Sequence, residues 1–152
     1  MDWRDEMRKK LADAGVEMLQ SLDSAKEFTL KYTFTDVSKI VDGRWKHSPI
    51  EYHFGVPWYI LIKHVNDHLE VYLHCERKEE NTPWSIQCAL QLDILHPSGK
   101  TESRQLEYIY QEGIGRGRKE FLKWEEMKKE YLVQNQLTVL AHVTIKSMIG
   151  FQ

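Results

Sequence analysis

The stretch that decides the fold is Trp84–Leu95, which reads WSIQCALQLDIL. Every second residue is apolar, and polar or small residues separate them. The apolar residues are Trp84, Ile86, Cys88, Leu90, Leu92 and Ile94. Successive side chains of a β-strand point to opposite faces, so this alternation predicts a long strand with one face in a core. The pattern places Leu90 on the inward face.

The same period recurs on both sides of this stretch. Leu69, Val71, Leu73 and Cys75 share one predicted face, and Glu70, Tyr72, His74 and Glu76 share the other. Further strands are expected near residues 28–37, 50–54, 58–62, 105–110 and 137–145. Asn66-Asp67 and Pro97-Ser98-Gly99 have the composition of turns. Seven or eight strands, with no room for crossover helices, indicate an all-β antiparallel sandwich or barrel.

Residues 1–25 follow a different period. Apolar residues three or four apart would form one stripe on a helix, and they are Trp3, Met7, Leu11, Ala14, Met18, Leu22 and Ala25. We therefore divide the chain into an amphipathic N-terminal helix, 1–25, and a domain, 26–152. The stripe is long enough for a short coiled coil that makes a homo-oligomer. The alternative is a helix that packs on its own domain.

Composition bounds the function. The chain of 152 residues has a net charge of -2, which favours neither nucleic acid nor an anionic membrane as partner. The start lacks an apolar stretch, so we expect no signal peptide and an intracellular location, cytoplasm or nucleus. Cys75 and Cys88 both fall on inward strand positions and are interpreted as core thiols. We expect a fold that needs no metal, cofactor or disulfide.

The residues suggest no catalytic constellation. Gly113, Gly115 and Gly117 miss the dinucleotide fingerprint, because Arg118 stands where its last glycine is required. The glycine segment is therefore interpreted as an irregular connection. His64, His74 and His142 are predicted at exposed strand positions. A Cys–His pair assembled in space stays open, although both cysteines are expected to be buried. The chain is predicted not to be an enzyme.

Several segments together resemble a MATH (meprin and TRAF homology) domain, and their sequences are most similar to the nematode group of this family. They are Lys31–Ser38, His53–Trp58, Leu69–Cys75, Trp84–Ile86, Phe121–Trp124, Tyr131–Val133 and Leu137–Gly150. The resemblance implies an eight-stranded antiparallel β-sandwich of the TRAF/MATH type that binds short extended peptides along one sheet. It implies an adaptor that recruits substrates to cullin-based ubiquitin ligases. Alternatives within the family are a coiled-coil scaffold of TRAF type and an accessory domain of a deubiquitinase or protease.

The resemblance also implies which residues of this chain correspond to those that line the peptide-binding groove of MATH domains. Two groove tyrosines correspond to Tyr72 and Tyr108, a groove phenylalanine to Leu90, and a Trp-Gly-Phe segment to Arg116-Gly117-Arg118. His74, on the predicted face of Tyr72, completes the predicted peptide-binding set. Arginine in place of two aromatic residues predicts an acidic ligand rather than the family's Ser/Thr-rich one. The alternative is that these charges only keep a glycine-rich segment in water.

Overall fold

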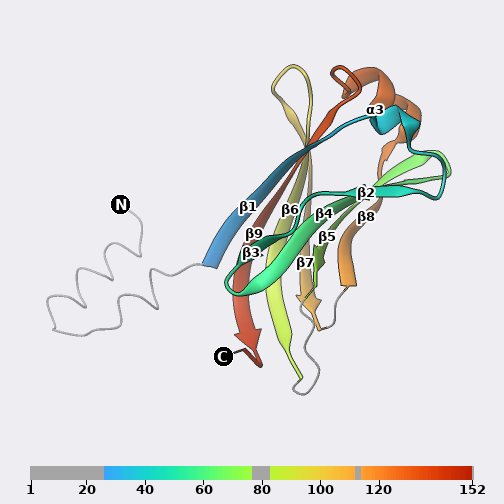
Figure 1. Cartoon of the computed structure of the whole chain (residues 1–152). Coiled ribbons are helices and arrows are strands. Elements are labelled where there is room, and N and C mark those ends of the chain that lie inside the picture. The colour runs from blue at the N-terminus through green and yellow to red at the C-terminus, as the bar shows by residue number, and fades with distance from the viewer. Residues whose placement is uncertain (1–25, 77–82, 112–113, 152) are drawn as a thin grey trace, which may run out of the picture.

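Nine antiparallel strands pair into two sheets in this computed structural model, which describes residues 26–76, 83–111 and 114–151 (Figure 1). Sheet A has the order β1 (Lys26–Phe34), β9 (Leu137–Ile149), β6 (Ser85–Leu95) and β7 (Thr101–Tyr110). Sheet B has the order β2 (Trp45–His47), β4 (Val56–Val65), β5 (His68–Cys75) and β8 (Ile114–Lys123), and β3 (Glu51–His53) pairs with β4. The predicted antiparallel β-sandwich is confirmed, with nine described strands where eight were expected, because β2 and β3 are separate three-residue strands.

The alternation in the sequence sets the faces of these strands. In β6, Leu90 lies opposite Val143 of β9 and Leu106 of β7, and its side chain is only 2% exposed. The core between the sheets holds large side chains such as Trp58, Tyr110 and Phe34. Burial of this apolar surface is the main favourable term of folding. The inward placement of Leu90 is therefore confirmed.

Both cysteines lie in this core, as predicted. Cys75 and Cys88 are buried, and neither is in a disulfide. Burial raises the pKa of the Cys88 thiol to about 12, because the low-dielectric interior disfavours a thiolate. A group with so high a pKa is a poor nucleophile at neutral pH.

Short helical elements lie at one end of the sandwich (Figure 1). They are a 3₁₀ turn, η1 (Val37–Lys39), and the helix α3 (Trp124–Glu130). The indole of Trp124 stacks on His64, with ring centroids 3.7 Å apart. His64 also bonds to the carbonyls of Ile40 and Asn66. The prediction of an exposed His64 is therefore wrong, and His74 and His142 are likewise half-buried.

The glycine segment differs most from expectation. Gly115 and Gly117 lie inside β8, which pairs with β5 along its length, so the predicted irregular connection is wrong. The pairing is irregular between Leu69 and Val71, where β8 contains extra residues. The predicted helix 1–25, with Trp3, Met7, Leu11, Met18 and Leu22, lies outside the described residues and stays a prediction.

Candidate functional site

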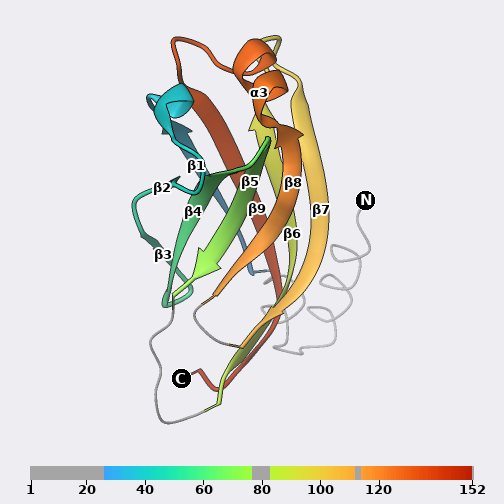
Figure 2. The same cartoon turned by 90° about the vertical axis from the view of Figure 1, so that its right-hand side faces the viewer.

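The strands β7 and β8 end their sheets on the same side of the sandwich and lie next to each other (Figure 2). Three β7 side chains each donate a hydrogen bond to a backbone carbonyl of sheet B. These bonds run from Tyr110 Oη to Leu73 O (2.9 Å), from Tyr108 Oη to Gly117 O (3.2 Å) and from Arg104 Nη2 to Phe121 O (2.8 Å). The bonds from Tyr108 and Arg104 reach β8 and the bond from Tyr110 reaches β5, so together they fix β7 against sheet B. We call this side of the sandwich the β7/β8 edge.

Two arginines of β8 point toward this edge. The register pairs Arg116 with Leu73 and Arg118 with Val71, whose side chains are in the core. Directly opposed residues share a face, so both arginines leave β8 on the side of sheet A. The guanidinium carbon of Arg116 lies 5.6 Å from the ring centroid of Tyr108, a cation–π distance.

Neither arginine has an anionic partner within residues 26–76, 83–111 and 114–151. The Nε of Arg116 is buried without a hydrogen-bond acceptor, and no carboxylate of these residues pairs with Arg116 or Arg118. A buried donor without an acceptor costs about 1–3 kcal/mol. The edge therefore offers two positive charges, one of them with an unmet hydrogen bond.

Tyr72 and His74 stand on the outer face of sheet B, beside two positions of β8 that have no side chain. In the register Tyr72 is opposite Gly117 and His74 is opposite Gly115. A Cβ at Gly115 would lie 2.3 Å from the His74 ring, and one at Gly117 would lie 1.9 Å from the carbonyl oxygen of Val71. The two glycines are therefore required by close approach rather than by flexibility.

The surroundings of the His74 ring favour its uncharged form. It stacks on Tyr59 with centroids 4.7 Å apart, and Tyr59 Oη donates to Glu76 at 2.7 Å. Burial lowers the pKa of His74, and His47 lowers it further against the opposing effect of Glu76. Burial and the bond to Glu76 raise the pKa of Tyr59 to about 12. His74 is therefore mostly uncharged at neutral pH.

The predicted peptide-binding residues fall into three places. Tyr72 and His74 are on the outer face of sheet B, whereas Tyr108, Arg116 and Arg118 are at the β7/β8 edge, and Gly117 joins the two groups. Leu90 is on β6 in the core, away from both. A role for these side chains in peptide binding stays a prediction, and the buried side chain of Leu90 gives it no direct support.

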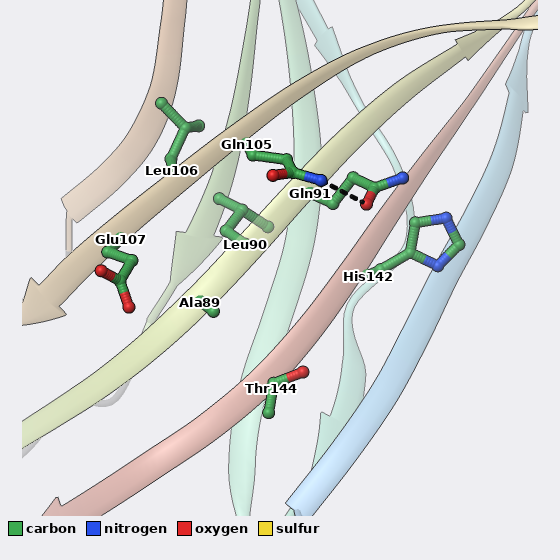
Figure 3. Close-up of a pocket in the computed structure, with 8 residues that line it drawn as sticks. All are labelled: Ala89, Leu90, Gln91, Gln105, Leu106, Glu107, His142 and Thr144. Carbon is green, nitrogen blue, oxygen red and sulfur yellow. Dashed lines mark hydrogen bonds between the residues drawn. The ribbon is translucent and has the colours of Figure 1, made fainter.

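A separate feature, a hollow, lies on the outer face of sheet A (Figure 3). Its polar side chains come from three strands, and they are Gln91, Gln105, Glu107, His142 and Thr144, around the small Ala89. Gln105 Nε2 donates to Gln91 Oε1 at 3.4 Å, and Lys146 pairs with Glu107. The amide and charged groups that line the hollow thus already have partners.

Asp93, a buried carboxylate next to this hollow, was missed by the sequence reasoning. It accepts hydrogen bonds from Ser103 Oγ (2.6 Å), His142 Nε2 (2.9 Å) and Gln91 Nε2 (3.0 Å). Burial by itself would raise the pKa of Asp93, but the three hydrogen bonds outweigh burial and hold it below its usual range. A carboxylate between Leu92 and Ile94 in the longest alternation was the available signal.

Two features are absent from the part of the chain that the structure describes. No group of three His, Cys, Asp or Glu side chains in that part is arranged to hold a metal ion. None of its helices has the length and apolarity to cross a bilayer.

Comparison with known proteins decides the family. The MATH domain model matches residues 34–145, which is most of the chain. The chain belongs to the MATH domain family. MATH domains are protein-interaction modules, so the resemblance read from the sequence is confirmed at the level of the domain.

The MATH domain of this chain has relatives of several kinds. It is 35% identical over 129 residues to BTB and MATH domain-containing protein 15 of Caenorhabditis elegans, covering 84% of the chain and 47% of that protein. It is 29% identical over 124 residues to BTB and MATH domain-containing protein 45 of the same organism, covering 81% of the chain and 26% of the relative. It is also 27% identical over 131 residues to Ubiquitin carboxyl-terminal hydrolase 7 of Drosophila melanogaster, covering 82% of the chain and 11% of that enzyme. The chain thus spans less than half the length of each of these relatives.

Proposed function

We propose that this MATH domain binds short extended segments of partner proteins at the β7/β8 edge. Extended peptides bind well at the open side of a terminal strand, where backbone groups give affinity and alternate side chains give specificity. β8 is the last described strand of sheet B, and the side chains of Tyr72 and His74 lie beside Gly117 and Gly115 on the outer face. Tyr108 would flank the segment from the side of sheet A.

The observation that carries the proposal is the pair of arginines without an anionic partner among the described residues. Arg116 and Arg118 have no ion pair with the described residues, and Arg116 Nε has no acceptor. A carboxylate or phosphate would supply that acceptor and could engage a guanidinium through two parallel hydrogen bonds. The proposed ligand is therefore an acidic or phosphorylated segment, and contacts so near the surface weaken with added salt.

A peptide array tests this proposal. Acidic, phosphorylated and neutral Ser/Thr-rich extended peptides are compared for the wild type and for Arg116→Ala combined with Arg118→Ala. Loss of a charge-assisted hydrogen bond of about 1.5–3 kcal/mol predicts at least a tenfold loss of affinity for the acidic peptides. The control is Lys31→Ala combined with Arg44→Ala, which removes the same net charge from exposed positions elsewhere. Equal binding of neutral peptides, or equal losses in the two double variants, contradicts an acidic ligand.

A second proposal concerns the pathway. The relatives that pair BTB with MATH support an adaptor that recruits substrates to a cullin-based ubiquitin ligase. The similarity to a ubiquitin carboxyl-terminal hydrolase supports the alternative of an accessory domain of a deubiquitinase, and the stripe in residues 1–25 supports a scaffold of TRAF type. Affinity capture of the full chain, probed for cullin subunits and for deubiquitinases, separates these cases. Absence of cullin subunits from the captured complexes contradicts the ligase adaptor.

A further inference from the structure

A pocket on the outer face of sheet B combines aromatic rings with a buried carboxylate. Its rings are Trp45, Tyr72 and His74, and its carboxylate is Glu70. The rest of the lining is Leu61, Lys63 and Gly115. We call it the Glu70 pocket. Trp45 is 53% exposed, which leaves much of its indole open to a ligand.

Glu70 has an unmet charge in this pocket. Its side chain is on the surface face of β5, yet the residue is only 8% exposed. Tyr72 Oη donates to Glu70 Oε1 at 2.7 Å, while Oε2 has no hydrogen-bond donor among the described residues and is not sealed from solvent. A carboxylate with so little contact with water is stabilised by a cation close to it.

The cation next to Glu70 in the sheet does not neutralise it. Lys63 is directly opposite Glu70 in the pairing of β4 and β5. Even so, the Lys63 ammonium makes no ion pair with Glu70 and no cation–π contact with Trp45 within the described part of the chain. His74 is mostly uncharged, because burial lowers its pKa. The pocket thus joins a negative charge and electron-rich rings without a matching cation.

The hollow over sheet A, whose lining is drawn in Figure 3, lacks such an unpaired carboxylate. Its neighbouring carboxylate, Asp93, receives three hydrogen bonds, and Glu107 is paired with Lys146. The charge of that surface is therefore already matched. The Glu70 pocket differs because its carboxylate has one bonded oxygen and one open oxygen.

We propose that the Glu70 pocket binds a positively charged side chain, arginine or lysine, presented by a partner protein. The aliphatic stem of such a side chain would lie on Leu61, its charge would meet Glu70, and Trp45 and Tyr72 would offer cation–π faces. The inference rests on the proposed binding of extended segments, since Tyr72 borders both this pocket and the β7/β8 edge. A preferred segment then carries an acidic group for Arg116 and Arg118 and a basic residue for Glu70.

Small probes test the pocket without the rest of a peptide. The chain labelled with ¹⁵N is titrated with N-acetyl-arginine amide, N-acetyl-lysine amide and the neutral N-acetyl-citrulline amide, and the indole N–H of Trp45 is followed by NMR. We expect a saturable shift with the two cationic amides and none with citrulline. Glu70→Gln, which keeps the shape and an acceptor for Tyr72, should weaken binding about tenfold, and Trp45→Ala should weaken it as well.

Two further variants complete the design. Glu27→Gln removes an exposed carboxylate on the outer face of sheet A and should leave the dissociation constant unchanged. Lys63→Gln removes a repelling cation and should tighten binding. Saturation by citrulline, no shift at Trp45, unchanged binding in Glu70→Gln, or binding seen only in Lys63→Gln would each overturn the proposal. The arginine double variant should still bind the amides, so failure of the β7/β8 edge as a peptide site is distinguished from failure of this pocket.

Discussion

Replacing Tyr110 with Phe removes one hydroxyl from the core and tests the link between the two sheets. Tyr110 is fully buried, and its hydroxyl donates to the Leu73 carbonyl of the opposite sheet at 2.9 Å. The ring itself stays, including its edge-on contact with Trp58 at 5.7 Å. The loss is therefore one buried hydrogen bond, and we expect the free energy of unfolding to fall by about 1–2 kcal/mol.

Thermal and urea unfolding measure this loss. For a domain of this size it corresponds to a decrease in Tm of about 2–8 °C. Burial, then the nearby thiols of Cys88 and Cys75, raise the pKa of Tyr110 well above its usual value, so the loss should be the same throughout pH 6–8. Tyr52→Phe is the matched control, because Tyr52 is 72% exposed and should change by less than about 0.5 kcal/mol. Equal stability of the two variants would refute a stabilising bond between Tyr110 and Leu73.

Three further predictions concern other parts of the chain. The folded-state pKa of Asp93 lies below its ordinary value of 3.8. The Asp93 carboxylate therefore stabilises the fold above pH 3.8, and this contribution is lost as the pH falls through the folded-state pKa. In urea titrations at acid pH, the difference in unfolding free energy between the wild type and Asp93→Asn should shrink accordingly. Gly117→Ala should destabilise the fold by about 2–3 kcal/mol, because its Cβ meets the backbone oxygen of Val71 at 1.9 Å. Gly115→Ala should cost less, since the His74 ring that its Cβ meets can move. Equal unfolding free energies of the two variants would contradict this. A chain that begins at Lys26 should be monomeric by light scattering while the full chain self-associates, and equal monomeric masses would assign residues 1–25 no role in assembly.

The sequence by itself determined which face of each long strand enters the core. The alternation from Trp84 to Ile94 placed Leu90 and Cys88 inward, and both are buried. Asn66 and Asp67 marked the turn between β4 and β5, where Asn66 has a positive φ of 55°. These features are readable because the two-residue period and the turn chemistry depend on neighbours along the chain.

The tertiary structure alone decided where the charged side chains go. Glycines at 115 and 117 suggested a loop, but pairing with β5 makes the segment a strand and turns Arg116 toward the edge beside Tyr108. Asp93 receives a hydrogen bond from His142, 49 residues away, and the Glu70 pocket needs the ring of Trp45 from another strand. Such groupings depend on register and on contacts between segments far apart in the chain, which a local pattern does not specify. The sequence thus indicated a surface for partners, and the packing of two sheets determined which charges that surface leaves unmatched.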